Sequence, residues 1–358
     1  MAHPEKLSIL ILPSMRLPYF SLLTDSLRHK GFYVKISPQF PRRGIIFGKK
    51  FTAIHLHMLD HIFLGKTAFE TARRIFMFFL VIVPAARLRG IRIVWTCHEL
   101  TAHEGDAHNV TGRLTRVVCR IACRIIVHNG ALRRELLEYC PQIRGKLITL
   151  PHGDLRPFYD HYLKAGTLRC KTQNFVFVSI GYMRPNKGND VIIRAFRRLR
   201  DPAARLVMTG NCNNLEFQRM LQDLAAMDSR ISLDVRNLTD QEVVALHQAA
   251  DVAVFAFRQC PTSGSVLTAL ALGTPAIAPR IGHVGELVDE SIGWTYAPET
   301  GEEGLLLAML DATRDHSLSA LKGKRAEQSV ADQNWNDIAH MMGKIYRGDY
   351  MATRERCK

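Results

Sequence analysis

One stretch of the chain, residues 251–278, constrains the fold more than any other. It begins with an apolar run, 251–257, that has the length and the Val and Phe content of a buried strand. A turn of small residues follows, and residues 266–272 have a helix pattern that Gly273 and Pro275 end. Residues 274–278 then form a second short apolar run. Because parallel strands need such a crossover, this unit predicts a parallel sheet covered by helices.

The same alternation of short apolar runs and amphipathic segments extends over most of the 358 residues. Further strands are expected at 8–12, 32–36, 53–57, 91–96, 124–128 and 146–150, and then at 175–180, 205–209 and 231–235. Helices are expected between them, including 20–30, 67–88, 112–123, 131–139, 190–199, 216–226, 242–249 and 304–313. Residues 151–172 contain two prolines and two glycines, so we expect them to link two α/β domains, residues 1–160 and 161–330.

The net charge of +15 is concentrated in the first half of the chain. Residues 1–164 contain 25 Lys and Arg against 11 Asp and Glu, a net charge of +14, and the remainder contributes +1. Such an excess attracts anionic lipid, nucleic acid or a phosphorylated acceptor. The basic runs lack the interleaved aromatic residues of nucleic-acid modules, which disfavours a nucleic acid. The first half is therefore expected to meet an anionic membrane surface.

The longest apolar run, residues 75–84, is too short to span a bilayer. It predicts a buried helix, and a helix lying in a membrane interface is the alternative. Eight cysteines are present without a Cys-x-x-Cys pair, and seven residues precede the first expected strand, too few for a signal peptide. Both features indicate a cytoplasmic protein. No Asp-x-Asp occurs, and the spacing of His98 and His103 is not typical of zinc, so no metal or cofactor is expected.

Polar loops follow several predicted strands of the second half, where open parallel sheets bind their ligands. Loop 181–188 offers Arg184 and Lys187 between glycines, and Arg258 ends another strand. The turn 262–265 opens a helix, whose free N–H groups and positive dipole end suit a phosphate. The turn alone favours an ordinary helix cap. Three cations and a helix start on one sheet edge together favour a diphosphate pocket.

These segments together resemble the nucleotide-sugar domain of GT-B glycosyltransferases, a group that includes the retaining family 4 enzymes. The resemblance rests on four motifs, which are residues 181–188, 250–254, 270–275 and 282–286. It implies an α/β GT-B fold of two facing Rossmann-like domains with a cleft between them, the donor on the second domain and the acceptor on the first. It also implies that the last helix, within residues 331–358, crosses back to the first domain.

The sequence departs from that group at three positions. Tyr182 stands where the group has a loop arginine, and Cys260 and Thr268 stand where it has two glutamates. The stereochemistry of that group is therefore not carried over. The turn 262–265 is instead similar to bacterial exopolysaccharide glycosyltransferases, as is the segment 95–104.

The loops and the resemblance together predict the residues of the site. Donor-binding residues are expected at Gly181, Arg184, Lys187, Arg258, Thr262, Ser263, Gly264, Ser265, Thr268 and Glu286. In the first half, His98 lies where the family has a histidine that contacts the sugar or acceptor. Glu104 is the predicted general base, ahead of Glu99. His152 is a further expected cleft contact, whereas the other strand histidines, His55, His57 and His128, are expected to be packing or hydrogen-bonded residues rather than catalysts.

The sequence thus predicts a hexosyltransferase that uses a GDP- or UDP-linked sugar. Its acceptor is expected to be lipid-linked or a polysaccharide in surface (exopolysaccharide) biosynthesis, at the inner face of the membrane, to which the protein binds peripherally. Two alternatives stay open. One is a basic polyanion- or nucleic-acid-binding protein with an inactive GT-B domain, and the other is a GT-B epimerase or phosphorylase.

Overall fold

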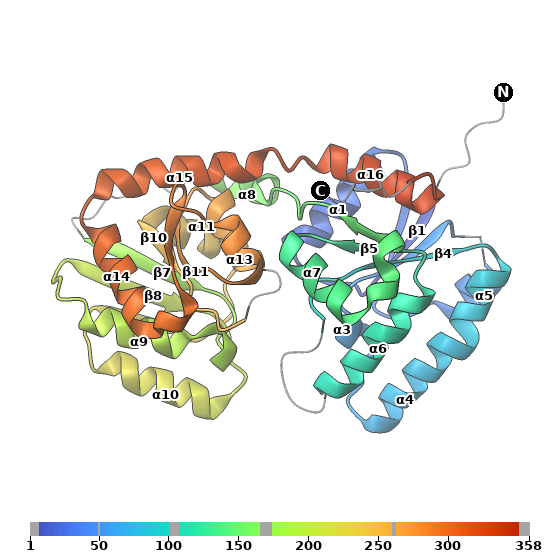
Figure 1. Cartoon of the computed structure of the whole chain (residues 1–358), viewed down its shortest axis with the longest axis horizontal. Coiled ribbons are helices and arrows are strands. Elements are labelled where there is room, and N and C mark those ends of the chain that lie inside the picture. The colour runs from blue at the N-terminus through green and yellow to red at the C-terminus, as the bar shows by residue number, and fades with distance from the viewer. Residues whose placement is uncertain (1–6, 49–50, 101–106, 165–173, 260–262, 351–358) are drawn as a thin grey trace. The chain divides into compact units, whose positions relative to one another are not determined.

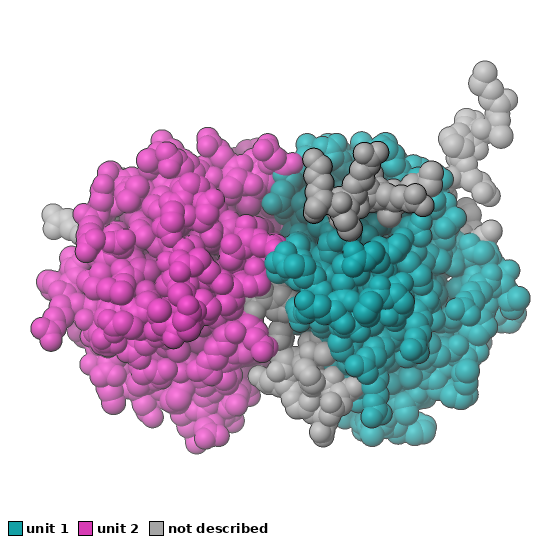
Figure 2. Space-filling view, in the orientation of Figure 1, with its two compact units in different colours: residues 1–153, 333–358 teal, residues 154–332 magenta. Residues whose placement is uncertain are grey.

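The computed structural model describes residues 7–48, 51–100, 107–164, 174–259 and 263–350 (Figure 1). The chain divides into two compact units, Met1–Gly153 with Gln333–Lys358, and Asp154–Asp332 (Figure 2). The domain boundary predicted at residue 160 lies at residue 153. Within the described residues, each unit is built on a parallel sheet of six strands with helices on it.

The first unit has the strand order β2-β1-β3-β4-β5-β6, and every neighbouring pair is parallel. Its described elements are β1 (Ser8–Leu12), α1 (Pro18–His29), β2 (Tyr33–Ile36), α2 (Arg42–Ile46), β3 (Ala53–Leu56), α3 (Leu59–Phe63), α4 (Ala68–Met77), a π-helical turn (Phe78–Ile82), α5 (Val83–Leu88), β4 (Arg92–Thr96), α6 (Ala107–Ile121), β5 (Arg124–Val127), α7 (Gly130–Tyr139), a 3-10 turn (Pro141–Lys146), β6 (Leu147–Thr149) and α16 (Trp335–Arg347).

Both faces of this sheet are covered, which is why its strands are continuous apolar runs. In β1, Leu10 and Leu12 belong to the core on one face, whereas Ile9 and Ile11 belong to the core on the other. Successive side chains of a strand point to opposite faces, so a sheet buried on both sides needs apolar residues at every position.

The last described helix, α16, packs on the first unit. Ile338, Met342 and Ile345 are buried there against residues of α1 and of the central strands. Gly343 allows the close approach, because a Cβ at this position would lie 2.8 Å from the Phe32 ring. The helix expected within residues 331–358 begins at Trp335, since Asn334 accepts a hydrogen bond from the Asn336 amide and caps α16.

The second unit has the strand order β12-β11-β10-β7-β8-β9, again parallel throughout. Its described elements are α8 (Arg156–Lys164), β7 (Phe175–Ile180), a 3-10 turn (Pro185–Lys187), α9 (Asn189–Arg198), β8 (Ala204–Thr209), α10 (Leu215–Ala226), β9 (Ile231–Asp234), α11 (Asp240–Ala249), β10 (Val252–Val254), α12 (Gly264–Ala271), β11 (Ala276–Pro279), α13 (Gly282–Leu287), β12 (Gly293–Tyr296), a 3-10 turn (Pro298–Thr300), α14 (Gly301–Thr313) and α15 (His316–Ala331).

The second sheet is doubly wound, and its order reverses between β7 and β10. The sheet edge beside this reversal is where such folds bind ligands. Four elements of this unit were missed in the sequence. Helix α8 lies within the predicted linker and buries Tyr159, the edge strand β12 is only four residues long, and helices α13 and α15 were not expected. Tertiary packing contributes to their stability, because most helical stability in proteins comes from packing rather than from propensity.

The contact between α16 and the first sheet generates a stability prediction. The buried Tyr346 hydroxyl lies 2.8 Å from His55 Nδ1 on β3. Tyr346→Phe leaves this buried nitrogen without its partner, and we expect the free energy of unfolding to fall by about 1–3 kcal/mol. Urea denaturation followed by circular dichroism measures the change. The matched control is Tyr33→Phe, an exposed tyrosine, which should stay within about 0.5 kcal/mol of the parent. Equal stability of both variants would contradict the assignment.

Candidate functional site

A pocket of the second unit lies at the switch point of its sheet. It is lined by residues that follow β7, by the end of β10 and by the first turn of α12, namely Ser179, Ile180, Gly181, Tyr182, Lys187, Asn189, Ile192, Val254, Phe255, Phe257 and Ser265. Three of the predicted donor-binding residues, Gly181, Lys187 and Ser265, therefore line one pocket. We call it the switch-point pocket.

Glycines bring the loop after β7 close to its neighbours. Gly188 has a φ of 66°, and a Cβ there would lie 2.0 Å from the carbonyl oxygen of Ala256. Gly181 has a φ of 138°, and its Cβ would lie 2.9 Å from Ser265 Oγ. Both the backbone conformation and the space therefore require glycine. The loop consequently passes directly over the end of β10, where Arg258 N donates to the Asn186 carbonyl oxygen at 3.0 Å.

Neighbouring side chains hold the three predicted cations. Lys187 Nζ lies 4.4 Å from the centre of the Phe257 ring, and the Arg184 guanidinium lies 4.2 Å from that of Tyr182. Such cation–π contacts position a charge without neutralising it. Arg258 instead faces Asp190, with 3.5 Å between Nη2 and Oδ2. Lys187 lines the switch-point pocket, and Arg258 shares the Asp190 carboxylate with Arg194, whose Nη2 lies 2.7 Å from the same Oδ2.

The small-residue turn combines a cap with an open helix start. Ser263 is buried, and its Oγ accepts a hydrogen bond of 3.3 Å from the Val266 amide, so it is the N-cap of α12. Gly264 is exposed, and a Cβ there would meet nothing within 4 Å. The first turn of α12 is therefore accessible beside the pocket. Thr262 lies outside the described residues.

Two predicted donor contacts lie apart from the switch-point lining. Thr268 is buried in α12, and its side chain hydrogen-bonds the phenol of Tyr159 on α8. Burial raises the pKa of Tyr159 to about 12, so this phenol stays protonated. Glu286 is exposed on α13. The structure therefore brings together the loop and α12 residues, and it does not gather Thr268 or Glu286 with them.

In the first unit, buried histidines surround Tyr19 at the carboxyl ends of the strands. The rings of His57, His98, His128 and His152 have centres 5.8, 5.3, 5.3 and 4.7 Å from that of Tyr19. The His55 ring lies next to that of His57, with 4.2 Å between the ring centres and a tilt of 39° between the planes. We call these five residues the histidine cluster. All five histidines were named from the sequence. That they lie together was not predicted, because they come from four different strand ends.

Burial keeps four members of the histidine cluster, His55, His57, His98 and His128, neutral. It lowers the pKa of His55 to about 3 and that of His128 to about 4, and it holds the pKa values of His57 and His98 well below the usual range. His128 Nδ1 lies 3.1 Å from the Leu150 carbonyl oxygen and therefore carries the proton it donates. At neutral pH these imidazoles act as hydrogen-bonding groups rather than as cations.

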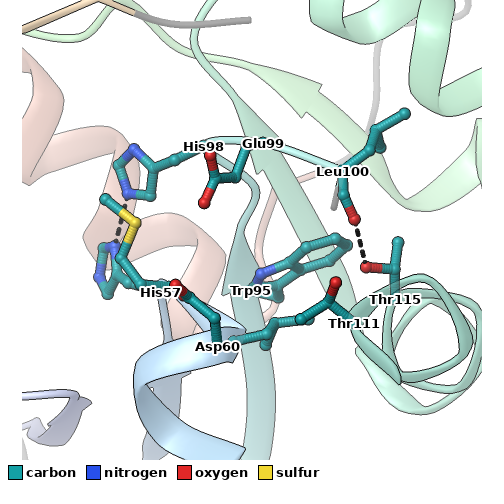
Figure 3. Close-up of a pocket in the computed structure, with 10 residues that line it drawn as sticks. His57, Asp60, Trp95, His98, Glu99, Leu100, Thr111 and Thr115 are labelled. Atoms are coloured by element: carbon teal, nitrogen blue, oxygen red, sulfur yellow. Dashed lines mark hydrogen bonds between the residues drawn. The ribbon is translucent and has the colours of Figure 1, made fainter. Parts of the chain in front are cut away.

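One hydrogen bond assigns the tautomers of His57 and His98. His57 Nδ1 lies 3.1 Å from His98 Nε2, and within the described residues the buried Nε2 of His57 has no partner. A buried N–H without an acceptor costs more than an unused lone pair, so the proton of His57 sits on Nδ1 and is donated to His98. The proton of neutral His98 is then on Nδ1, which points away from His57 (Figure 3). His98 thus presents a hydrogen-bond donor.

A second pocket lies beside this pair. It is lined by residues after β3, after β4 and from α6, namely His57, Met58, Leu59, Asp60, Trp95, His98, Glu99, Leu100, Thr111 and Thr115. Figure 3 shows Asp60 and Glu99 on the same side of this pocket as the histidine pair. Thr115 donates to the Leu100 carbonyl oxygen at 2.8 Å and so ties the loop to α6. The pocket therefore offers two carboxylates and two neutral imidazoles.

The sequence predicted His98 and Glu99 near one another but missed Asp60, an isolated acid in no motif. Glu104, the predicted base, and His103 lie outside the described residues. His152 belongs to the histidine cluster rather than to the lining of this pocket. Across the described part of the chain, no three His, Cys, Asp or Glu side chains are arranged to hold a metal ion.

Comparisons with known proteins identify the enzyme class. Residues 174–315 match the family model described as glycosyl transferases group 1. A GDP-mannose:glycolipid 4-beta-D-mannosyltransferase of Xanthomonas campestris pv. campestris is 24% identical over 333 residues, which cover 92% of this chain and 87% of that relative. The chain is a GT-B glycosyltransferase. The family, fold class and enzyme class predicted from the sequence are thus confirmed.

Solved structures similar to this glycosyltransferase share its fold. Sucrose-phosphate synthase from Thermosynechococcus elongatus superposes with a TM-score of 0.72 at 16% identity, over 96% of this chain and 99% of that one. The Anabaena protein HepE, in complex with UDP and glucose, superposes with a TM-score of 0.68 at 14% identity, over 95% and 99%. Because these similarities extend over nearly the whole chain, both units share the fold of these proteins.

The neutral histidines of the glycosyltransferase make its stability depend on pH. Folded His55 and His128 have pKa values of about 3 and 4, so below a pH of about 6.5 the unfolded chain binds more protons than the folded one. The free energy of unfolding should therefore fall as pH is lowered from about 7 to about 5, by up to ~1.4 kcal/mol per pH unit for each such histidine. Urea denaturation at several pH values measures this slope.

Two variants test the source of that slope. His55→Gln should flatten it by the share of one histidine, whereas His29→Gln, at an exposed position of α1, should leave it unchanged. A free energy of unfolding that stays constant over this pH interval would contradict the neutral assignment of the histidine cluster.

Proposed function

We propose that this glycosyltransferase moves a hexose from a nucleoside-diphosphate sugar to a lipid-linked or polysaccharide acceptor in surface polysaccharide biosynthesis. The observation that carries the donor class is the switch-point pocket, where Lys187 and Ser265 meet the glycine loop. A GDP-linked donor is preferred over a UDP-linked one because the Xanthomonas relative, similar over 92% of this chain, is named for GDP-mannose and a glycolipid. The alternatives, a polyanion-binding protein and an epimerase or phosphorylase, have no comparable support.

The donor diphosphate would lie in the switch-point pocket. Lys187 and Arg184 supply positive charge that offsets the charge developing on the leaving diphosphate, and the start of α12 adds free backbone N–H groups. Ser265 lines the same space, and Gly264 leaves the backbone open to a phosphate oxygen. In this scheme side chains and backbone dipoles stabilise the leaving group, and we propose that transfer requires no metal.

The remaining donor contacts are more distant from that pocket. Glu286 is proposed to bind the sugar, as the resemblance implies. Thr268 must exchange its hydrogen bond with Tyr159 before it can bind the donor ribose, so its contribution is small.

The acceptor hydroxyl would lie in the pocket of Asp60 and Glu99 in the first unit. Neutral His98 donates from Nδ1 to a sugar oxygen, and a carboxylate accepts the proton of the attacking hydroxyl. Inversion at the anomeric carbon requires such a base, whereas retention does not. Glu104 keeps the role that the sequence assigns to it, and Glu99 and Asp60 are the acids of the described pocket.

We also propose that the enzyme acts at the cytoplasmic face of the membrane as a peripheral protein. The net charge of +14 on residues 1–164 supports attraction to anionic lipid. No described helix is both long enough and apolar enough to cross a bilayer.

A thermal-shift screen tests the donor class directly. A ligand that binds the folded state raises apparent stability by mass action. We expect GDP and GDP-sugars to raise the midpoint more than UDP or ADP and their sugars. The absence of a shift with every nucleotide would refute the donor assignment, and a shift with UDP alone would refute the GDP preference.

Lys187→Ala tests the charge at the leaving group. We expect turnover to fall by about 10²- to 10³-fold because a charge that stabilises the transition state is lost. Transfer of labelled sugar measures the effect, and Lys324→Ala, an exposed lysine on α15, is the matched control. Chelation with EDTA should leave the parent activity unchanged. Full activity in Lys187→Ala, or abolition by EDTA, would contradict the scheme.

The carboxylates are tested together with the stereochemistry. If the product is inverted, we expect a loss of about 10²- to 10⁴-fold in kcat for one of Glu104→Gln, Glu99→Gln and Asp60→Asn, with nucleotide affinity unchanged. If the product retains its configuration, we expect little loss from any of them. Proton NMR coupling of the product gives the anomeric configuration. Glu138→Gln, an exposed acid on α7, is the control. An inverted product made at full rate by all three variants would show that the base lies elsewhere.

A further inference from the structure

We propose that one exposed helical face of the first unit inserts into the interface of an anionic membrane. This face, called the apolar stripe, consists of Phe69, Phe76, Leu80 and Leu88. It lies on the continuous helical run formed by α4, the π-helical turn and α5, which Figure 1 shows as one long rod. The inference deepens the proposed function, since it rests on a lipid-linked acceptor and names the surface that meets the lipid.

The apolar stripe has no protein cover among the described residues. Its four side chains are between 59% and 89% exposed, and α4 has no buried residue at all. The opposite face of the run packs on the core through Phe78, Ile82 and Ala86. The sequence predicted a buried helix over residues 75–84, and this is correct for one face only. When a helix is apolar on two opposite faces, the core buries one of them and the other stays exposed.

The π-helical turn aligns the apolar stripe. Phe76, Leu80, Pro84 and Leu88 follow one another at four-residue steps, and all four are exposed. In a regular α-helix each such step advances by about 40° around the axis, which would rotate the later residues toward the core. The wider turn at residues 78–82 offsets part of that advance. The exposed apolar residues therefore remain on one side of the rod.

Cations flank the apolar stripe. Residues 66–90 contain five Lys and Arg and a single acid, Glu70. Glu70 is paired with Arg74, at 2.5 Å between Oε1 and Nη2, so it contributes no net negative charge. Lys66, Arg73 and Arg87 are exposed beside the apolar residues. Aromatic and aliphatic side chains between exposed cations fit the boundary of acyl chains and anionic headgroups.

A neighbouring aromatic residue extends this surface. Arg89 donates from Nη1 and Nη2 to the carbonyl oxygens of Ile45 and Gly48, each at 2.7 Å. These bonds tie the end of α5 to the segment that follows α2, where Phe47 is 84% exposed. Apolar contact with the membrane can therefore continue past the end of the rod.

The charges decide between a bilayer and a second copy of this chain. Two copies packed stripe to stripe would bring Lys66, Arg73 and Arg87 of each together, which is repulsive. An anionic bilayer offers opposite charge and an apolar layer at the same depth. The inferred occupant is accordingly the anionic membrane.

The test is binding of the full chain to vesicles. Wild type should float with vesicles of phosphatidylglycerol and phosphatidylcholine at low salt, and it should bind phosphatidylcholine alone weakly. The triple variant Phe69→Ser/Phe76→Ser/Leu80→Ser should bind at least about tenfold more weakly because the insertable apolar area is lost.

The matched control is Leu215→Ser/Met227→Ser/Leu307→Ser. It removes comparably exposed side chains of the second unit and should bind as wild type does. Arg73→Gln/Arg87→Gln should weaken binding and its salt dependence.

A spectroscopic variant places the surface in the lipid. In Phe76→Trp, vesicles should shift the indole emission to the blue, and doxyl-labelled lipids should quench it. An unchanged emission in the bound protein overturns the inference, as does wild-type binding by the triple serine variant or failure of wild type to bind at low salt. Self-association that the triple variant abolishes, without vesicle binding, would assign the face to a second copy and likewise overturn it.

Activity with a water-soluble acceptor separates this inference from the proposed function. The triple variant should transfer sugar to such an acceptor at the wild-type rate, because the stripe lies outside both pockets. If vesicle binding depends on the apolar stripe but no acceptor receives sugar, the proposed function is refuted and the assignment of the membrane surface stands. Normal transfer with vesicle binding that ignores the stripe would refute the surface alone.

Discussion

Parallel strand pairing is the constraint on which both units depend. Every strand pair in the two sheets is parallel, so the chain must cross over after each strand, and all carboxyl ends open at one edge of their sheet. The residues placed directly after the strands therefore meet, although they are far apart in the sequence. Both pockets arise in this way, one after β3 and β4 and the other after β7 and β10.

The two edges use opposite electrostatics. In the second unit, a glycine loop brings half-buried Lys187 to the switch-point pocket beside an open helix start, which suits a charged diphosphate. In the first unit, burial around Tyr19 keeps His57 and His98 neutral, which suits directional hydrogen bonds to hydroxyls. This difference between the two pockets fits the proposed substrates, since the donor carries a charged diphosphate and the acceptor carries hydroxyl groups.

Burial also explains the two roles of apolar residues in the first unit. The sheet needs apolar cover on both faces, and α16 supplies part of it from the far end of the chain, with its Tyr346 hydrogen-bonded to His55. The rod of α4 and α5 supplies cover with one face and keeps a second apolar face in solvent. A surplus of apolar surface beside cations is the pattern of a protein that works at an interface.

Local chemistry in the sequence determined much of this protein. Apolar runs of strand length specified the parallel sheets. The glycines of residues 181–188 indicated the loop that lines the switch-point pocket, because a tight loop after a strand needs glycine whatever surrounds it. Only the tertiary structure decided which distant side chains meet. Asp60 carries no local signal, and the histidines look like separate packing residues until four strand ends bring them around Tyr19. Likewise, the pattern of residues 68–88 indicates an apolar helix. It does not show how much of the helix the core covers, because burial depends on the neighbouring elements as well as on the helix itself.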